Sequence, residues 1–107
     1  MNVLIIGAGE IGFYLALRLQ AERHDVVVVE RNSTRAAIHS AELDVPVGPG
    51  NGASPAVLAR ARIDTADLVA AVTEVDEVNL VTSLLAKGYG VETTVVRLQS
   101  EELRGEA

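Results

Sequence analysis

The chain has 107 residues, of which 49% are hydrophobic, and it carries a formal net charge of −6 at pH 7. This length accommodates one hydrophobic core, and no apolar run approaches the roughly 18–20 residues of a membrane-spanning helix. The negative charge argues against nucleic acid as a direct partner. The absence of cysteine excludes disulfides and thiolate metal sites and fits the cytosol.

The N-terminal segment predicts a strand, a glycine turn, a helix and a second strand. Residues 2–6 are continuously apolar and mostly β-branched, as expected for a strand buried on both faces. A G-x-G-x-x-G turn follows, formed by Gly7, Ala8, Gly9, Glu10, Ile11 and Gly12. It leads into a helix with a broad apolar face. Residues 25–30 predict a second buried strand that ends on the acidic residue Glu30.

Each part of this βαβ unit has a physical role in holding a dinucleotide. Gly7 permits the tight turn, Gly9 lets the backbone approach a pyrophosphate, and Gly12 allows the helix to pack closely on the sheet. The phosphates would face free N–H groups at a helix N-terminus, where the dipole favours anions. Glu30 is placed to accept hydrogen bonds from ribose hydroxyls. The unit predicts a dinucleotide or adenine-nucleotide site; the alternative is an ordinary turn with a surface carboxylate.

The rest of the chain alternates helices with strands. The predicted elements are a helix from Asn32 or Ser33 to about Glu42, a strand over 44–47, a helix starting at Ser54-Pro55, a strand over 68–72, a helix over 76–87 and a strand within 91–98. Residues 99–107 are polar and are expected to begin another helix.

This alternation predicts an α/β fold, a Rossmann-like doubly wound parallel sheet with helices on both faces. Pro46 indicates that the third strand lies at an edge, which supports the strand order 3-2-1-4-5. Ligands bind outside the carboxyl ends of the strands at the switch point between strands one and four. The expected rim consists of the glycine turn, Glu30-Arg31, residues 50–53 and Thr73-Glu74.

Several stretches resemble the TrkA-N family, also called RCK or KTN domains, which are cytoplasmic regulators of potassium uptake systems and channels. They are residues 3–12, 28–32, 50–52 and 67–79. The last, with its A-V-T-x-x-D-E-x-N pattern, is the most specific, and the resemblance covers nearly the whole chain. It implies a non-enzymatic regulatory subunit, peripheral on the inner face of the cell membrane. That subunit would bind a nucleotide, gate an integral-membrane potassium transporter or channel, and form a homo-oligomer in the full-length protein.

The resemblance also assigns the binding residues. Those implied to wrap the phosphates are Gly7, Ala8, Gly9, Glu10, Ile11 and Gly12. Glu30 and Arg31 would hold the adenosine ribose and flank the base. Asn51 and Gly52 would line the adenine, and Thr73 would lie under the ligand at the end of the fourth strand.

This sequence departs from the family pattern at two of those positions. Asn51 replaces an aspartate that is common in its loop, which removes a charge near the base. Glu10 stands where ATP-responsive relatives often carry arginine, and a carboxylate there would repel a triphosphate tail. NAD(H) is therefore the expected ligand, with ATP, ADP or AMP as alternatives. By the family pattern, residues 1–107 form one nucleotide-binding lobe without its sixth strand and crossover helix, a fragment of a longer regulator.

No catalytic or metal-binding constellation is predicted. His24 and His39 lack ligand spacing and are expected at the surface. Asp76 and Glu77 are interpreted as solvated carboxylates that complement a helix dipole. Arg97 is left open between a phosphate contact and an interface. The alternative function is the cofactor domain of an NAD-dependent oxidoreductase, although no histidine or lysine is a plausible partner for hydride transfer.

Overall fold

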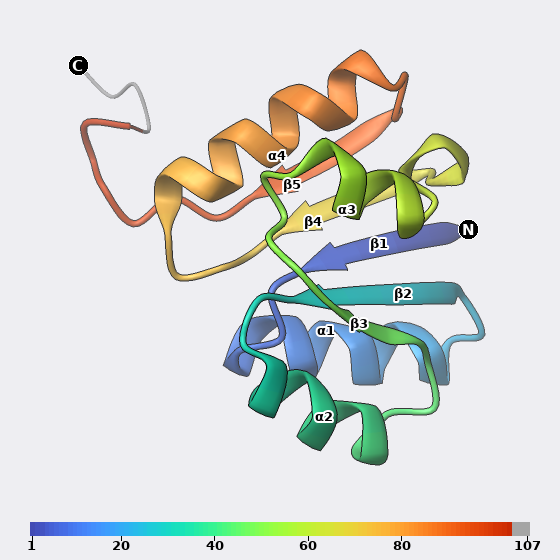
Figure 1. The fold of residues 1–107 in the computed structure, drawn as a ribbon. Coiled ribbons are helices and arrows are strands. Elements are labelled where there is room, and N and C mark those ends of the chain that lie inside the picture. The colour runs from blue at the N-terminus through green and yellow to red at the C-terminus, as the bar shows by residue number, and fades with distance from the viewer. Residues whose placement is uncertain (104–107) are drawn as a thin grey trace.

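A parallel sheet forms the centre of the computed structural model, which describes residues 1–103 (Figure 1). The elements are β1 (Asn2–Ile6), α1 (Glu10–Ala21), β2 (Asp25–Glu30), α2 (Ser33–Glu42), β3 (Val47–Pro49), α3 (Pro55–Arg60), a 3₁₀ helix (Ile63–Thr65), β4 (Leu68–Ala71), α4 (Asp76–Gly88) and β5 (Thr93–Val96). The strand order is β3-β2-β1-β4-β5, with every neighbouring pair parallel. The predicted fold class and strand order are confirmed.

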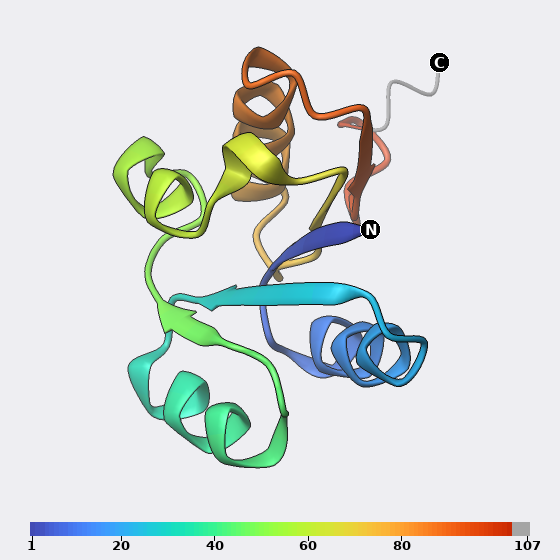
Figure 2. The same cartoon turned by 90° about the vertical axis from the view of Figure 1, so that its right-hand side faces the viewer.

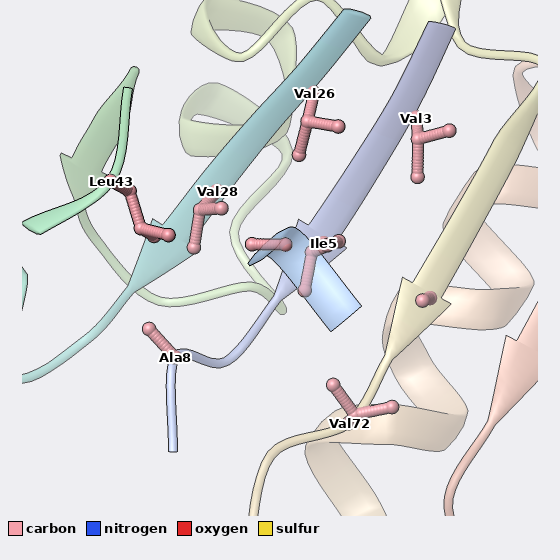
Figure 3. Close-up of a cluster of buried hydrophobic side chains, with 9 residues drawn as sticks. Val3, Ile5, Ala8, Val26, Val28, Leu43 and Val72 are labelled. Carbon is pink, nitrogen blue, oxygen red and sulfur yellow. The ribbon is translucent and has the colours of Figure 1, made fainter. Parts of the chain in front are cut away.

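Helices cover both faces of the sheet: α1 and α2 on one, α3 and α4 on the other (Figure 2). Successive residues of β1 face opposite cores, because side chains alternate along a strand. Val3 and Ile5 join the core beneath α1, shown in Figure 3, whereas Leu4 and Ile6 join the core beneath α3 and α4. Each fully buried aliphatic side chain of this kind contributes about 1.5–3 kcal/mol to folding. The continuous apolar run of β1 is thereby explained.

The third strand differs from its predicted position. It comprises Val47–Pro49 rather than residues 44–47, and it pairs with the end of β2. Leu43 is anchored in the core at the end of α2, so residues 44–46 serve to carry the chain to the sheet edge. The carbonyl of Pro46 still accepts a hydrogen bond from Val28 N–H at 2.9 Å. A proline N-terminal to the strand and another at its end are tolerated because β3 is an edge strand.

Side-chain caps start two of the helices where the sequence predicts them. Asn32 Oδ1 accepts from Arg35 N–H at 2.9 Å to begin α2, and Ser54 Oγ accepts from Val57 N–H at 3.4 Å to begin α3. Residues 101–103 form a turn, and the rest of the expected C-terminal helix lies outside the described residues. None of the helices within residues 1–103 combines the length and apolar character needed to cross a membrane.

His39 is half-buried rather than fully exposed at the surface. Its ring stacks at a tilt on Phe13 of α1, with the ring centroids 4.5 Å apart. Its Nδ1 atom is buried without a hydrogen-bond partner in the described part of the chain. The side chain therefore acts mainly as a packing element between α1 and α2.

Candidate functional site

The glycine turn between β1 and α1 is shaped by close approaches at two of its glycines. Gly7 has φ of +104°, and a Cβ atom there would lie 3.0 Å from the Thr73 backbone. A Cβ atom on Gly12 would overlap the carbonyl oxygen of Gly7. Gly9 differs, because its φ is −72° and a Cβ atom there would meet, beyond its chain neighbours in the described part of the chain, only the Arg35 guanidinium, at 3.8 Å. The space above Gly9 is therefore open.

Helix α1 begins at this open space without a side-chain cap. Gly9 occupies the N-cap position, and within the described chain no side chain accepts from the first-turn N–H groups. These groups have no intrahelical acceptor and carry the positive end of the helix dipole. They are consequently available to an anion, unlike the capped starts of α2 and α3.

Glu30 ties the glycine turn to the turn that follows β2. Its side chain is only 6% exposed. Oε1 accepts a hydrogen bond from Ala8 N–H at 2.7 Å, and Oε2 accepts one from Asn32 N–H at 2.8 Å. Arg35 Nη1 lies 3.7 Å from Oε1. The carboxylate is held in place at both oxygens, and its remaining lone pairs can still accept from a ribose hydroxyl.

Helix α4 organises the opposite side of the rim through buried polar side chains. Asn79 is fully buried, and its Oδ1 accepts from the N–H of Thr73 at 2.9 Å and from its hydroxyl at 2.7 Å. Asn79 Nδ2 donates to the carbonyls of Thr73 at 3.0 Å and Arg97 at 2.8 Å. Thr82 Oγ1 donates to the carbonyl of Gly52 at 2.7 Å. One helix thus fixes the ends of β4 and β5 and the loop before α3.

Asp76 has a different role from the solvated carboxylate expected at this position. One of its oxygens accepts from Gln99 N–H at 2.9 Å and the other from Ser100 N–H at 2.8 Å. It therefore binds the segment that follows β5 to the start of α4. Together with Asn79, it supplies a physical reason for the A-V-T-x-x-D-E-x-N spacing, since both polar residues hold backbone beyond their own helix.

The parts of this rim enclose a cavity of about 230 Å³ outside the carboxyl ends of β1, β2 and β4. The predicted binding residues that line it are Gly7, Gly9, Glu10, Ile11, Glu30, Arg31, Asn51, Gly52 and Thr73. Ala8 and Gly12 are not part of the lining. The side chain of Ala8 lies in the core beneath α1 (Figure 3), and its N–H is taken by Glu30. Gly12 is buried against Gly7 and serves close packing.

Other lining residues were not assigned from the sequence. They include Arg35, Val75, Val78 and Arg97, whereas Glu74 lines the cavity as the predicted rim implied. Arg97, which the sequence left open, faces the cavity from the end of β5, and its Nη1 lies 3.5 Å from the Thr73 carbonyl. Arg35 lies on the first turn of α2, and its position three residues after the Asn32 cap is the one signal that could have indicated it.

Charges balance around the cavity although the chain as a whole is acidic. The lining carries three carboxylates, Glu10, Glu30 and Glu74, and three guanidiniums, Arg31, Arg35 and Arg97. Their formal sum is zero, against −6 for the whole chain. A bound anion would thus meet a rim with no net formal charge, with Arg31 and Arg35 on the side of β2 and Arg97 at the end of β5. No cluster of three metal-ligating side chains occurs within residues 1–103.

Comparison with known proteins gives consistent results for sequence and fold. The family model described as the TrkA-N domain matches residues 3–105. A Trk system potassium uptake protein TrkA homolog from Archaeoglobus fulgidus is 43% identical over 102 residues, which cover 95% of this chain and 23% of that relative. The chain therefore spans less than a quarter of that relative's length.

Solved structures share the architecture at low sequence identity. The NAD(P)-binding domain of an exopolyphosphatase-related protein from Archaeoglobus fulgidus aligns with a TM-score of 0.83 at 16% identity, covering 96% of this chain and 77% of that one. The Shewanella denitrificans Kef CTD in AMP-bound form aligns with a TM-score of 0.74 at 18% identity, covering 89% of this chain and 57% of that one. At these identities the likeness shows the fold alone.

Proposed function

The chain belongs to the TrkA-N domain family, and from this premise we propose that it is a regulatory nucleotide-binding module. Its ligand is NAD(H) in the first place, with ATP, ADP or AMP as alternatives. Occupancy of the cavity biases a conformational equilibrium that an integral-membrane potassium transporter or channel senses. The observation that carries the proposal is the open space above Gly9, next to the uncapped start of α1.

The residue roles in this proposal follow the lining of the cavity. The first-turn N–H groups of α1 receive the pyrophosphate. Glu30 and Arg31 take the adenosine ribose, while Asn51 and Gly52 lie along the adenine and Thr73 lies beneath the ligand. Because Glu30 already engages Ala8 N–H, that N–H is not counted among the phosphate donors.

The transporter, the peripheral position at the inner face of the membrane and the homo-oligomer are parts of the same proposal. They are supported by the name of the relative from Archaeoglobus fulgidus, a Trk system potassium uptake protein homolog. We further propose that residues 1–107 act as one nucleotide-binding lobe of a longer regulator, in line with the 23% of that relative that the chain spans.

Ligand titrations test the proposal directly. NAD(H) is expected to bind more tightly than ATP, and both more tightly than NADP. The 2′-phosphate of NADP would face Glu30, whose oxygens are both held by backbone N–H groups and cannot turn away. Two like charges about 4 Å apart repel by about 1 kcal/mol in water and by more at a buried rim. NADP should therefore bind at least about tenfold more weakly than NAD.

Isothermal titration calorimetry of all these nucleotides at one ionic strength is the measurement, because salt screens the charges involved. Equal affinity for NADP and NAD would contradict the role of Glu30. Clearly tightest binding of ATP would contradict the argument from Glu10. Absence of binding by every nucleotide would overturn the proposed function.

Hydride-transfer activity is the alternative, and we expect none. The cavity lining carries no histidine, lysine, tyrosine or cysteine among the described residues, so the carboxylates Glu10, Glu30 and Glu74 are the side chains left there to exchange a proton with a substrate. Spectrophotometric assays with NAD and a panel of alcohols, hydroxy acids and aldehydes should show no turnover. Activity that follows the protein through purification and disappears in Gly9→Val would establish the oxidoreductase instead.

A further inference from the structure

Arg35 is the side chain nearest to the open space above Gly9. Apart from Gly9 and its two chain neighbours, its Nη1 atom is the one heavy atom of residues 1–103 within 4 Å of the point where a Cβ on Gly9 would lie, at 3.8 Å. The same nitrogen is 3.7 Å from Glu30 Oε1. The Arg35 side chain is 40% exposed, and its backbone is fixed by the Asn32 cap. The guanidinium thus lies between a buried carboxylate and the place where a phosphate would approach the turn.

The donors of this guanidinium are not used up by Glu30. A separation of 3.7 Å is an ion pair but is too long for a hydrogen bond. Within residues 1–103 the Arg35 side chain donates no hydrogen bond, although guanidinium carries five N–H donors. Charge attraction therefore holds the group near Glu30 while leaving its hydrogen-bonding edge available to a ligand.

A phosphate above Gly9 needs such a group for two reasons. Glu30 takes the N–H of Ala8, which removes one backbone donor from the turn. The same buried carboxylate would repel a phosphate placed beside it. A guanidinium between the two offsets that repulsion and can bind phosphate oxygens in a bidentate manner.

We propose that Arg35 is a specificity-determining residue that binds the ligand's phosphate above Gly9 while remaining paired with Glu30. It makes the cavity select phosphorylated nucleotides over nucleosides. The inference rests on the proposed nucleotide site and assigns this residue a contact there. A purely structural Arg35, which only holds the Glu30 carboxylate in position for the ribose, would act equally on ligands with and without a phosphate.

Adenosine and AMP differ by one phosphate and therefore separate these two roles. The experiment measures both affinities by calorimetry, at one ionic strength, for the wild type, Arg35→Gln, Arg35→Lys and Arg60→Gln. Arg60 is exposed in the last turn of α3 and is not part of the cavity lining. Its replacement matches the change in net charge and serves as the control.

Arg35→Gln should weaken AMP binding about tenfold or more, the loss expected for a charge-assisted phosphate contact. Adenosine affinity should stay within about twofold of the wild-type value. Arg35→Lys should give an intermediate AMP affinity, because lysine keeps the charge without the planar fork. Arg60→Gln should bind both ligands as the wild type does.

Equal weakening of adenosine and AMP, or no weakening of AMP, would overturn the role of Arg35. If circular dichroism shows that Arg35→Gln does not fold, the ratio of AMP to adenosine affinity in Arg35→Lys decides: a ratio equal to that of the wild type overturns the proposal. A wild type that binds neither AMP nor NAD would instead defeat the proposed function, and the role of Arg35 with it.

Discussion

Replacing Gly9 by valine is expected to abolish nucleotide binding, a loss of at least about a hundredfold or 2.7 kcal/mol, while leaving the fold intact. The φ of −72° and ψ of −163° at Gly9 are open to an L-amino acid. The new side chain would project toward the open space in which the first-turn N–H groups of α1 would meet a pyrophosphate. Calorimetry measures the binding, and thermal melts followed by circular dichroism measure the stability.

Gly12→Ala provides the matched contrast on the same turn. Its Cβ would overlap the Gly7 carbonyl oxygen, so α1 would have to move away from β1. We expect this variant to lose several kcal/mol of stability, a large part of the roughly 5–15 kcal/mol typical of a domain. If Gly9→Val instead bound nucleotides like the wild type, the site would have to lie elsewhere on the molecule.

Asn79→Leu is expected to destabilise the protein by about 3 kcal/mol or more, although the leucine side chain has the same branching and number of heavy atoms. The change removes the Asn79 partner of the Thr73 N–H, the Thr73 hydroxyl and the Arg97 carbonyl, and leaves the Thr73 carbonyl only its longer contact with Arg97. Each polar group left buried and unsatisfied costs about 1–3 kcal/mol. Urea denaturation at constant m-value measures the loss. Nucleotide affinity should also fall, because Thr73 and Arg97 line the cavity.

Ser83→Ala on the same helix is the control. Among the described residues, Ser83 Oγ donates only to the Leu80 carbonyl within α4, so its removal should change stability by less than about 1 kcal/mol. If Asn79→Leu proved no more destabilising than Ser83→Ala, the hydrogen bonds of Asn79 would not be what holds the ends of β4 and β5.

The overall fold could be predicted because the spacing of hydrophobic residues and the alternation of strands with helices are both local features of the sequence. The strand order was also correct, although the proline used to argue it does not lie within β3. Pro46 precedes the strand and Pro49 ends it, so the edge position was correct while the boundary was wrong. Helix α2 ends where Leu43 is buried in the core, and the position of that burial depends on tertiary packing.

The candidate site could be predicted where it follows from backbone position. The glycine turn, Glu30 and Thr73 lie at strand ends, which parallel topology brings to one rim. Arg35 and Asp76 could not be placed in this way, because their side chains reach partners on other elements. Asp76 accepts hydrogen bonds from the N–H groups of residues 99 and 100. The periodicity of the helix sequence gives no indication of a contact so distant along the chain. From sequence alone, a carboxylate at the start of a helix is interpreted as solvated, because its partner on another element is not known.

The hydrogen bonds of Asp76 to the backbone of residues 99 and 100 also affect how a force on the end of the described chain would reach the domain. Backbone N–H groups of Gln99 and Ser100 are held by the first residue of α4, close to Val75 and Val78 in the cavity wall. Tension applied to the chain beyond Ser100 therefore passes into α4 before it reaches the hydrogen bonds between β4 and β5. Asp76 thereby couples the start of α4, which borders the cavity, to residues 99 and 100. A movement of α4 that widened or narrowed the cavity would displace the outgoing chain with it.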